Sequence, residues 1–483
     1  MVKICLVFII LIYQFWSALA YGSMSQTNKK VLLKTQTTTA RTDEIDEFKT
    51  NNNSLQIGFQ SHTYLQSSDA AAAQENSFQL QYKFNFVNGS NLAKTDVIFG
   101  GYVQNSFLYA AIPQLYYQHS LKLADHKESD TFSYGRKIID VSRLDSTFNL
   151  GLINVLFTQD FLSFQSQGLT GFFNEYQSRL LGLEVGLLPI YLPNQEPSVK
   201  DVDGRLVSSN RWVKKPPSQF AFNNQNKEII YSVNYNKVNK LIFSSGALAL
   251  VRVGEVKNNI HWVGSFSKRP LNELVLERET YADLDVVGKV NLIPNILYSD
   301  IFTSDLRFDT EKLKSSLSYI SDYPENKTAQ DFYSIQTLSP ISGFSISMQY
   351  ELDIFKQRTL ELGFAAAEFK GGEITDINFD GSENIFTFSK QRLQYKQPVQ
   401  LSVASDIFSF SHHPLVSRLK WLYDREQQGT VFSTEVSLKT WASLTGHLGL
   451  DILGTVQHKT EDIGFIQQFQ ANDRVYGGLE YVF

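Results

Sequence analysis

Cysteine is almost missing from this 483-residue sequence, in which Cys5 is the only one. A chain cleaved after Ala20 would contain no thiol, which excludes disulfide bonds, thiolate zinc sites and a cysteine nucleophile. Long apolar runs are scarce too, because the best internal candidate, residues 180–192, is interrupted by Glu184 and Pro189. A membrane helix needs about 20 apolar residues, so we expect none inside the chain. Residence in a membrane would then require a closed β-barrel, which satisfies every backbone polar group in hydrocarbon.

An excess of positive charge is also lacking. The 44 Lys and Arg residues face 49 Asp and Glu residues, which gives a formal net charge of −5. A protein that binds nucleic acid electrostatically needs a basic face, so no nucleic-acid partner is expected. Aromatic residues make up 13% of the chain, which is more than a disordered protein would carry.

Familiar catalytic motifs are absent. The sequence has no Gly-x-Ser-x-Gly elbow, no His-Glu-x-x-His and no Gly-x-x-x-x-Gly-Lys phosphate loop. We therefore expect no cofactor and no enzymatic activity. An enzyme whose acid and base groups meet only in the folded barrel stays open as an alternative.

The first twenty residues are typical of a secretory signal peptide. Lys3 precedes the apolar run from residue 4 to residue 15, and Ala18-Leu19-Ala20 has the small-x-small pattern of a cleavage site. Residues 1–20 are thus expected to be removed after Ala20; an uncleaved anchor is the alternative. Residues 21–53 are polar and Thr-rich, as in a flexible leader.

Period-two alternation dominates the rest of the chain. Apolar and polar residues alternate from Phe78 to Phe86 and again from Phe344 to Leu352, which places one class on each face of a strand. Turn dipeptides such as Asn88-Gly89 and Asp380-Gly381 separate these runs. Several runs reach the roughly 9 to 11 residues of a membrane strand. The sequence predicts an all-β protein, a single closed antiparallel transmembrane β-barrel of about 16–18 strands over residues 54–483; a secreted two-sheet sandwich is the alternative.

The end of the chain alternates in the same way. Phe483, Tyr481 and Leu479 occupy one face. This pattern resembles the C-terminal β-signal of Gram-negative outer-membrane proteins. The resemblance implies that the barrel-assembly machinery reads Phe483, Tyr481 and Leu479 and that the last strand pairs with the first. The length of the chain is similar to that of 16- to 18-stranded porins and alginate-export-type channels, which implies outer-membrane lipid and a hydrophilic solute or polysaccharide as partners.

The same alternation assigns residues to the interior of the barrel. An Arg or Lys on the lipid face near the membrane midplane would cost roughly 2–4 kcal/mol, so charged positions are expected to face inward. The candidate pore-lining residues are Gln79, Gln81, Lys83, Lys289, Arg307, Arg418, Lys420, Glu435, Lys439, His447, Asp451, Arg474 and Glu480. Both signs of charge are present, which weakens the idea of a conduit for an anionic polysaccharide.

One region departs from the alternation. Residues 157–220 hold five of the twelve prolines, and proline cannot donate to a strand ladder, so we expect a long loop there. The loop either covers the surface or folds into the pore as a constriction. The function that follows is a passive aqueous channel across the outer membrane. A plugged barrel with a structural or surface-binding role is the alternative.

Overall fold

The computed structural model describes most of the chain. Its described residues are 52–66, 74–103, 107–122, 128–208, 210–213, 218–222, 225–234, 241–254, 259–282, 288–328, 333–355, 358–378, 380–382, 391–410, 413–440, 443–456 and 464–483. The expected signal peptide, residues 1–20, lies outside these ranges, as does the expected leader apart from its last two residues. No helix within the described ranges is long and apolar enough to cross a membrane.

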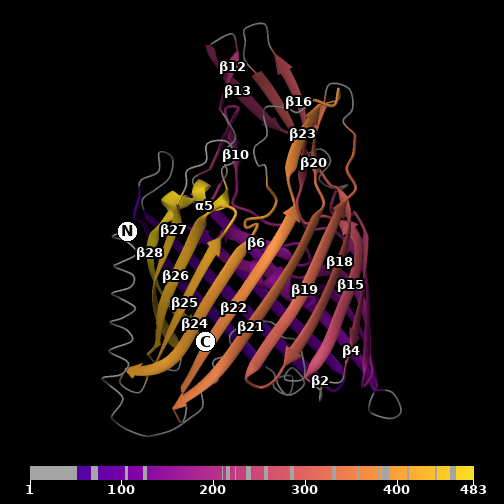
Figure 1. Ribbon diagram of the computed structural model, residues 1–483, viewed down its shortest axis with the longest axis vertical. Helices are drawn as coiled ribbons and strands as arrows, with labels where there is room; N and C mark the ends of the chain where they lie inside the picture. Colours follow the sequence, from indigo (N-terminus) through magenta and orange to yellow (C-terminus); the bar gives the residue numbers. More distant parts are fainter. Residues whose placement is uncertain are drawn as a thin grey trace.

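Eighteen strands form one closed barrel (Figure 1). In order around the wall they are β1 (Asn52–Tyr64), β2 (Gln74–Asn88), β3 (Asn91–Tyr102), β4 (Phe107–Lys122), β5 (Ser129–Lys137), β8 (Leu169–Gln177), β9 (Leu181–Ile190), β14 (Gly246–Val253), β15 (Ile260–Pro270), β18 (Tyr298–Asp309), β19 (Leu313–Pro324), β21 (Ile341–Phe355), β22 (Arg358–Gly371), β24 (Pro398–Phe410), β25 (His413–Asp424), β26 (Gly429–Lys439), β27 (Leu444–Thr455) and β28 (Arg474–Val482). Each strand is antiparallel to its neighbours, and β28 pairs with β1, with Tyr481 opposite Ile57. The predicted closed barrel is confirmed, and its 18 strands lie at the upper end of the expected range of about 16–18.

Side chains along these strands alternate between two environments. On β18, Phe302 and Leu306 are exposed on the outer surface, whereas Ile301, Thr303 and Asp305 are buried. Large apolar side chains recur on the outer surface, among them Phe59, Leu108, Phe172, Phe266, Phe344 and Leu448. An apolar outer band around a closed wall is the pattern of a barrel that stands in lipid.

The two ends of the barrel differ in the length of their connections. At the end that holds the start of β1 and the end of β28, β21 and β22 are joined by two residues and β18 and β19 by three. At the opposite end lie the long connections, which are residues 138–168, 191–245, 271–297, 325–340, 372–397 and 456–473. Bacterial outer-membrane barrels have short periplasmic turns and longer extracellular loops, so we take the end with the long connections as extracellular.

Four of the long connections build a second, six-stranded sheet beyond the extracellular mouth (Figure 1). Its strands are β12 (Gln219–Phe222), β13 (Gln225–Val233), β17 (Gly288–Asn295), β16 (Val275–Ala282), β20 (Tyr333–Leu338) and β23 (Ile374–Asn378). Its interior contains an apolar cluster around Ile229 and Val290 and an ion pair between Arg278 and Asp376. We call this structure the external sheet. A small hairpin, β10 (Lys200–Val202) and β11 (Arg205–Val207), lies beside β13.

The expected loop at residues 157–220 is corrected by the structure. Two barrel strands, β8 and β9, lie inside that range and separate two different connections. In β9 the outward Leu183, Val185 and Leu187 are exposed, whereas the inward Gly182, Glu184, Gly186 and Leu188 are buried. The strand therefore alternates, and it was missed because the prolines of this region, among them Pro189 within β9, favoured a loop.

Candidate functional site

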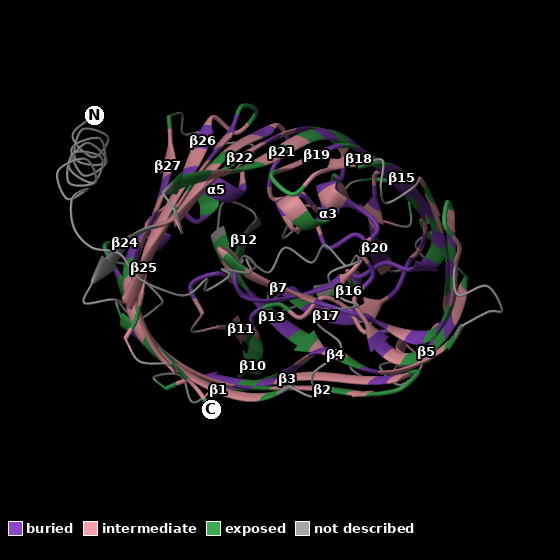
Figure 2. Cartoon of the chain, turned by 90° about the horizontal axis from the view of Figure 1, so that it is seen from below, coloured by how far each residue is buried: buried purple, intermediate pink, exposed green. Residues whose placement is uncertain are grey.

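Residues 138–168 leave the wall after β5 and fold into the barrel lumen, where they contain α3 (Arg143–Phe148), β6 (Val155–Asp160) and β7 (Ser163–Gln167). We call them the inserted segment. In Figure 2, α3 and β7 lie inside the ring of barrel strands. The N-cap Ser142 accepts a hydrogen bond from the Asp145 N–H, and Asn149 ends the helix with a φ of 49°. Such caps stabilise even a single helical turn.

An apolar core joins the inserted segment to one side of the wall. Its members from the inserted segment include Ile139, Leu144, Phe148, Leu152 and Ile153, and its members from the wall include Leu248, Leu250, Val263, Ile301, Ile320 and Phe369. Burying a side chain of this size stabilises a fold by about 1.5–3 kcal/mol. Gly343 leaves room for the Phe369 ring, since a Cβ there would meet Cδ1 of Phe369 at 2.4 Å. The inward face from β14 to β22 is therefore partly apolar and covered by the inserted segment, whereas the alternation predicted a wall in contact with water.

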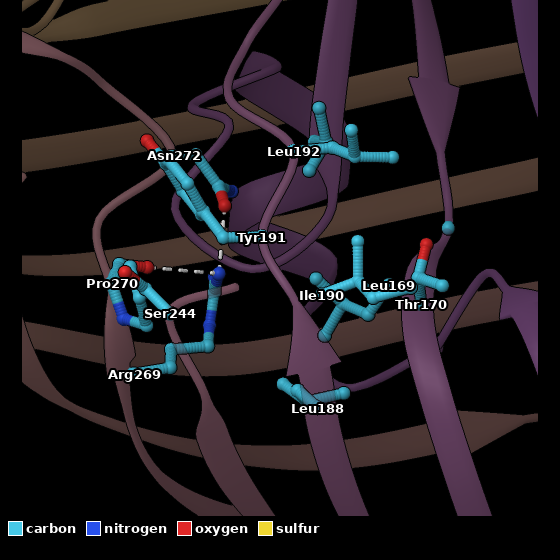
Figure 3. A pocket seen from close by; sticks show the side chains of 12 residues that line it. Leu169, Thr170, Leu188, Ile190, Tyr191, Leu192, Ser244, Arg269, Pro270 and Asn272 are labelled. Atoms are coloured by element: carbon cyan, nitrogen blue, oxygen red, sulfur yellow. Dashed lines mark hydrogen bonds between the residues drawn. The ribbon is translucent and has the colours of Figure 1, made fainter. Parts of the chain in front are cut away.

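Arg269 on β15 fixes the turn between α3 and β6. Its guanidinium donates to the carbonyls of Leu152 at 2.5 Å and Ile153 at 2.7 Å. It also donates to Oδ1 of Asn272 at 2.7 Å (Figure 3). The Asn272 amide in turn donates to the carbonyl of Gly151 at 2.6 Å. These bonds satisfy carbonyl groups that would otherwise be buried without a partner.

Asp145 completes the same turn from the other side. Its carboxylate accepts hydrogen bonds from the N–H groups of Leu152 and Ile153 at 2.9 and 3.3 Å. Burial raises the pKa of Asp145 to about 6, and the two N–H donors oppose that effect. The group is thus mainly ionised at neutral pH.

A second polar anchor ties α3 to β18. Arg307 bonds both Asp305, on its own strand, and Asp140 of the inserted segment, the latter at 2.9 Å. One guanidinium nitrogen of Arg143 donates to both carboxylate oxygens of Asp309, at 2.6 and 2.7 Å. The backbone N–H of Arg143 donates to the Asp305 carboxylate at 2.7 Å. Arg307 is buried in this network, so this predicted lining residue holds the inserted segment and does not face open water.

Arg474 on β28 is the third anchor. It lies between two carboxylates, 2.6 Å from Asp160 at the end of β6 and 2.7 Å from Asp451 on β27. Its guanidinium also lies 5.8 Å from the centre of the Trp212 ring and 5.5 Å from that of Tyr476. Arg474 and Asp451 are both buried, and with Asp160 they join the inserted segment to β27 and β28, the last two strands of the wall.

Next to this ion-pair network, aromatic side chains from several connections meet at the extracellular ends of β25–β27. We call this group the aromatic cluster; it contains Phe161, Leu162, Trp212, Tyr395, Leu422, Val431, Leu453, Phe465, Ile466 and Phe469. Phe465 belongs to α5 (Phe465–Gln468), and its ring lies 5.7 Å from that of Phe161. The tip of the inserted segment is thus held by packing as well as by charge.

The remaining wall is polar and in contact with solvent. On β25 the Arg418 side chain is 47% exposed and lies 3.3 Å from Glu435 on β26. Lys420 and Lys439 are exposed on the same inner surface. The predicted residues Gln79, Lys83, His447 and Glu480 also lie on inward faces and are half-buried. We call this surface, formed by β25–β28 and β2, the wet wall.

Two predicted lining residues have other surroundings. Gln81 faces inward on β2 but is buried, and its amide donates to Asp96 at 2.7 Å. Lys289 lies on β17 of the external sheet and not in the barrel wall. The prediction for Lys289 is wrong because alternation occurs in any two-faced sheet, whether or not the sheet belongs to the barrel.

A cavity opens between the inserted segment and the wet wall. We call it the lumen cavity, and it is lined by residues such as Phe148, Phe161, Tyr395, Gln400, Lys420 and Ser433. Within the described ranges, no group of three or more His, Cys, Asp or Glu side chains could hold a metal ion. No sequence pattern indicates this cavity, since its lining residues meet only in the folded barrel.

The closed wall, the apolar outer surface and the partly wet interior together decide the class of protein. The chain is an outer-membrane β-barrel. No model of a known family matches it, and no curated protein does either.

Several solved barrels resemble the chain in structure. The carbohydrate-binding barrel Wzi of Escherichia coli, involved in group 1 capsule assembly, is 9% identical over 91% of this chain and 86% of its own, with a TM-score of 0.41. OccAB3 of Acinetobacter baumannii is 10% identical over 89% and 98%, with a TM-score of 0.43. OpdQ of Pseudomonas aeruginosa is 10% identical over 89% and 96%, with a TM-score of 0.42. These values are too low to transfer a function.

Proposed function

We propose that this outer-membrane β-barrel is a channel with a narrow aqueous route for small hydrophilic solutes. The observation that carries the proposal is the wet wall, where Arg418, Lys420, Lys439 and Glu435 stay accessible to solvent beside a firmly anchored inserted segment. Charged side chains that stay solvated along one side of the interior are typical of a barrel with a polar, water-filled lumen.

The route is passive and restricted. Charged side chains of both signs replace part of the hydration shell of a passing solute. Because neither positive nor negative charge predominates on the wet wall, we expect only a weak preference between cations and anions. The inserted segment takes up much of the lumen, and the aromatic cluster lies next to the route at its extracellular end. A polysaccharide chain needs a wider opening, so small solutes are the better candidates.

Recordings from single channels test the proposal directly. Protein refolded without residues 1–20 should give small, discrete current steps in a planar bilayer, with weak preference between cations and anions. Folding is checked separately by the shift in gel mobility on heating. A correctly folded barrel that leaves the bilayer silent at all voltages would contradict the channel.

A plugged barrel with a surface role is the second candidate. The external sheet stands over the mouth, and the aromatic cluster joins the inserted segment to three other extracellular connections. A silent but folded barrel in the recordings would favour this role, in which the external sheet contacts a partner.

We also propose that the chain end is recognised during assembly. Leu479 and Tyr481 point outward, the Tyr481 and Phe483 rings lie 4.5 Å apart, and Phe483 is 65% exposed beyond the end of β28. Removing Phe483 should lower the amount of heat-modifiable barrel in cells several-fold, because the assembly machinery loses its contact. The purified variant should refold as stably as the parent, since the Phe483 side chain is not buried.

The control for this prediction is Phe59→Ala, which removes an equally exposed outward ring from β1. An equal loss in cells for both variants would mean that aromatic content, and not the chain end, sets the yield. Unchanged yield without Phe483 would refute recognition of the chain end.

A further inference from the structure

We propose that the lumen cavity binds a small organic anion that carries one negative charge and an apolar ring. Only the idea that the bound anion is a transported solute rests on the proposed function. Binding of the anion to the barrel can be tested without it. The lumen cavity is lined by both a positive charge and aromatic surface, which fits a ligand that carries both groups.

The charge comes from Lys420 on β25. Its direct neighbours across the sheet are Ser402 on β24 and Ser433 on β26, so no carboxylate stands opposite it on either side. In the part of the chain that the structure describes, no carboxylate lies within ion-pair distance of Lys420. Asp451 acts on it electrostatically, but that carboxylate is already bonded to Arg474 at 2.7 Å.

Three arginines that face the lumen differ from Lys420 in this respect. Arg418, two residues earlier on the same strand, has Glu435 directly opposite and 3.3 Å away. Arg307 and Arg474 each contact two carboxylates. A cation between two serines attracts an anion more strongly than a cation that is already paired with a carboxylate, because no negative charge in contact with it opposes the interaction.

Gln400 supplies a second polar group. It lies on β24 beside Lys420, and its Oε1 is buried with no hydrogen-bond partner among the described residues. A buried amide oxygen without a partner is costly, and a bound ligand removes that cost. A half-turn of the amide presents its N–H₂ group to a carboxylate that also contacts Lys420.

The apolar side of the lumen cavity is part of the aromatic cluster. Phe161, Leu162, Tyr395 and Leu422 line both, and Phe148 of α3 extends the surface. A flat ring gains from stacking on these side chains, whereas a hydrated sugar would have to give up hydrogen bonds there. A cation is disfavoured by Lys420, so an anion with a ring is the occupant that satisfies both sides.

Calorimetric titration of the refolded, detergent-solubilised barrel tests this with a matched pair of probes, 3-phenylpropionate and its neutral amide 3-phenylpropanamide. The anion should bind at least about tenfold more tightly, as expected when a hydrogen bond to a charged group is lost. Lys420→Met should abolish that preference. Lys94→Met removes a different inward lysine, on β3 outside the lumen cavity, and this variant should still prefer the anion over the amide. Equal binding of both probes, or an unchanged preference in Lys420→Met, would overturn the site.

The outcome separates the site from the channel. Charge-dependent binding in a barrel that gives no current would keep the anion site and refute the proposed function. Current steps with no charge-dependent binding would keep the channel and refute the anion site. Heat-induced mobility shifts confirm that each variant is folded before either result is read.

Discussion

Single-channel conductance should rise several-fold when residues 143–165 of the inserted segment are replaced by a short Gly-Ser linker. Those residues form α3, β6 and the first part of β7, which lie inside the barrel. The conductance of a pore grows with its open cross-section, so removing them should raise it. The barrel itself should persist, since each wall strand is hydrogen-bonded to two neighbours. Bilayer recordings measure the conductance, and the mobility shift on heating measures the folded fraction.

Two further variants guard this prediction. Because the deletion exposes apolar wall residues such as Ile320 and Phe369 to water, a milder change, Phe161→Ser with Leu162→Ser, loosens only the tip and should give a smaller rise. Replacing the β10–β11 hairpin, residues 200–207, by the same linker should leave conductance within about twofold, because the main contacts of this hairpin are with β13 of the external sheet. A folded deletion variant with parental conductance would mean that the inserted segment does not restrict the route.

Arg474→Met should be the most destabilising single substitution at an inward charge, with a loss of about 3–5 kcal/mol in the free energy of unfolding. The substitution leaves Asp160 and Asp451 buried without the cation that both contact. Arg418→Met is the matched control on the wet wall, and it should cost less than about 1 kcal/mol because that ion pair is in contact with solvent. Urea unfolding in lipid vesicles, followed by tryptophan fluorescence, measures both values.

The triple variant Arg474→Met, Asp160→Asn and Asp451→Asn separates charge from packing. Removing both carboxylates should restore much of the lost stability, since the main cost is uncompensated buried charge. If Arg474→Met and Arg418→Met prove equally mild, the ion-pair network around Arg474 does not hold the inserted segment to the wall.

Local patterns predicted much of the wall, although β8 and β9 were predicted as a loop. The alternation from Phe78 to Phe86 predicted β2, and the parity of Arg418, Lys420 and Glu435 placed them on the inner face that the structure shows. These inferences succeed because a strand repeats every two residues and lipid accepts only one class of side chain on its outer face. Nothing in the pattern distinguished a barrel strand from β17 of the external sheet, so Lys289 was misplaced.

The sequence by itself determined that this is an all-β chain able to close a lipid-facing barrel, because strand period and outward apolarity are local properties. Only the tertiary structure decided what fills that barrel. Arg474 and Asp160, like Lys420 and Phe161, are distant in the sequence and meet only when residues 138–168 enter the lumen. Such contacts depend on the path of the chain through space, and no periodicity records that path.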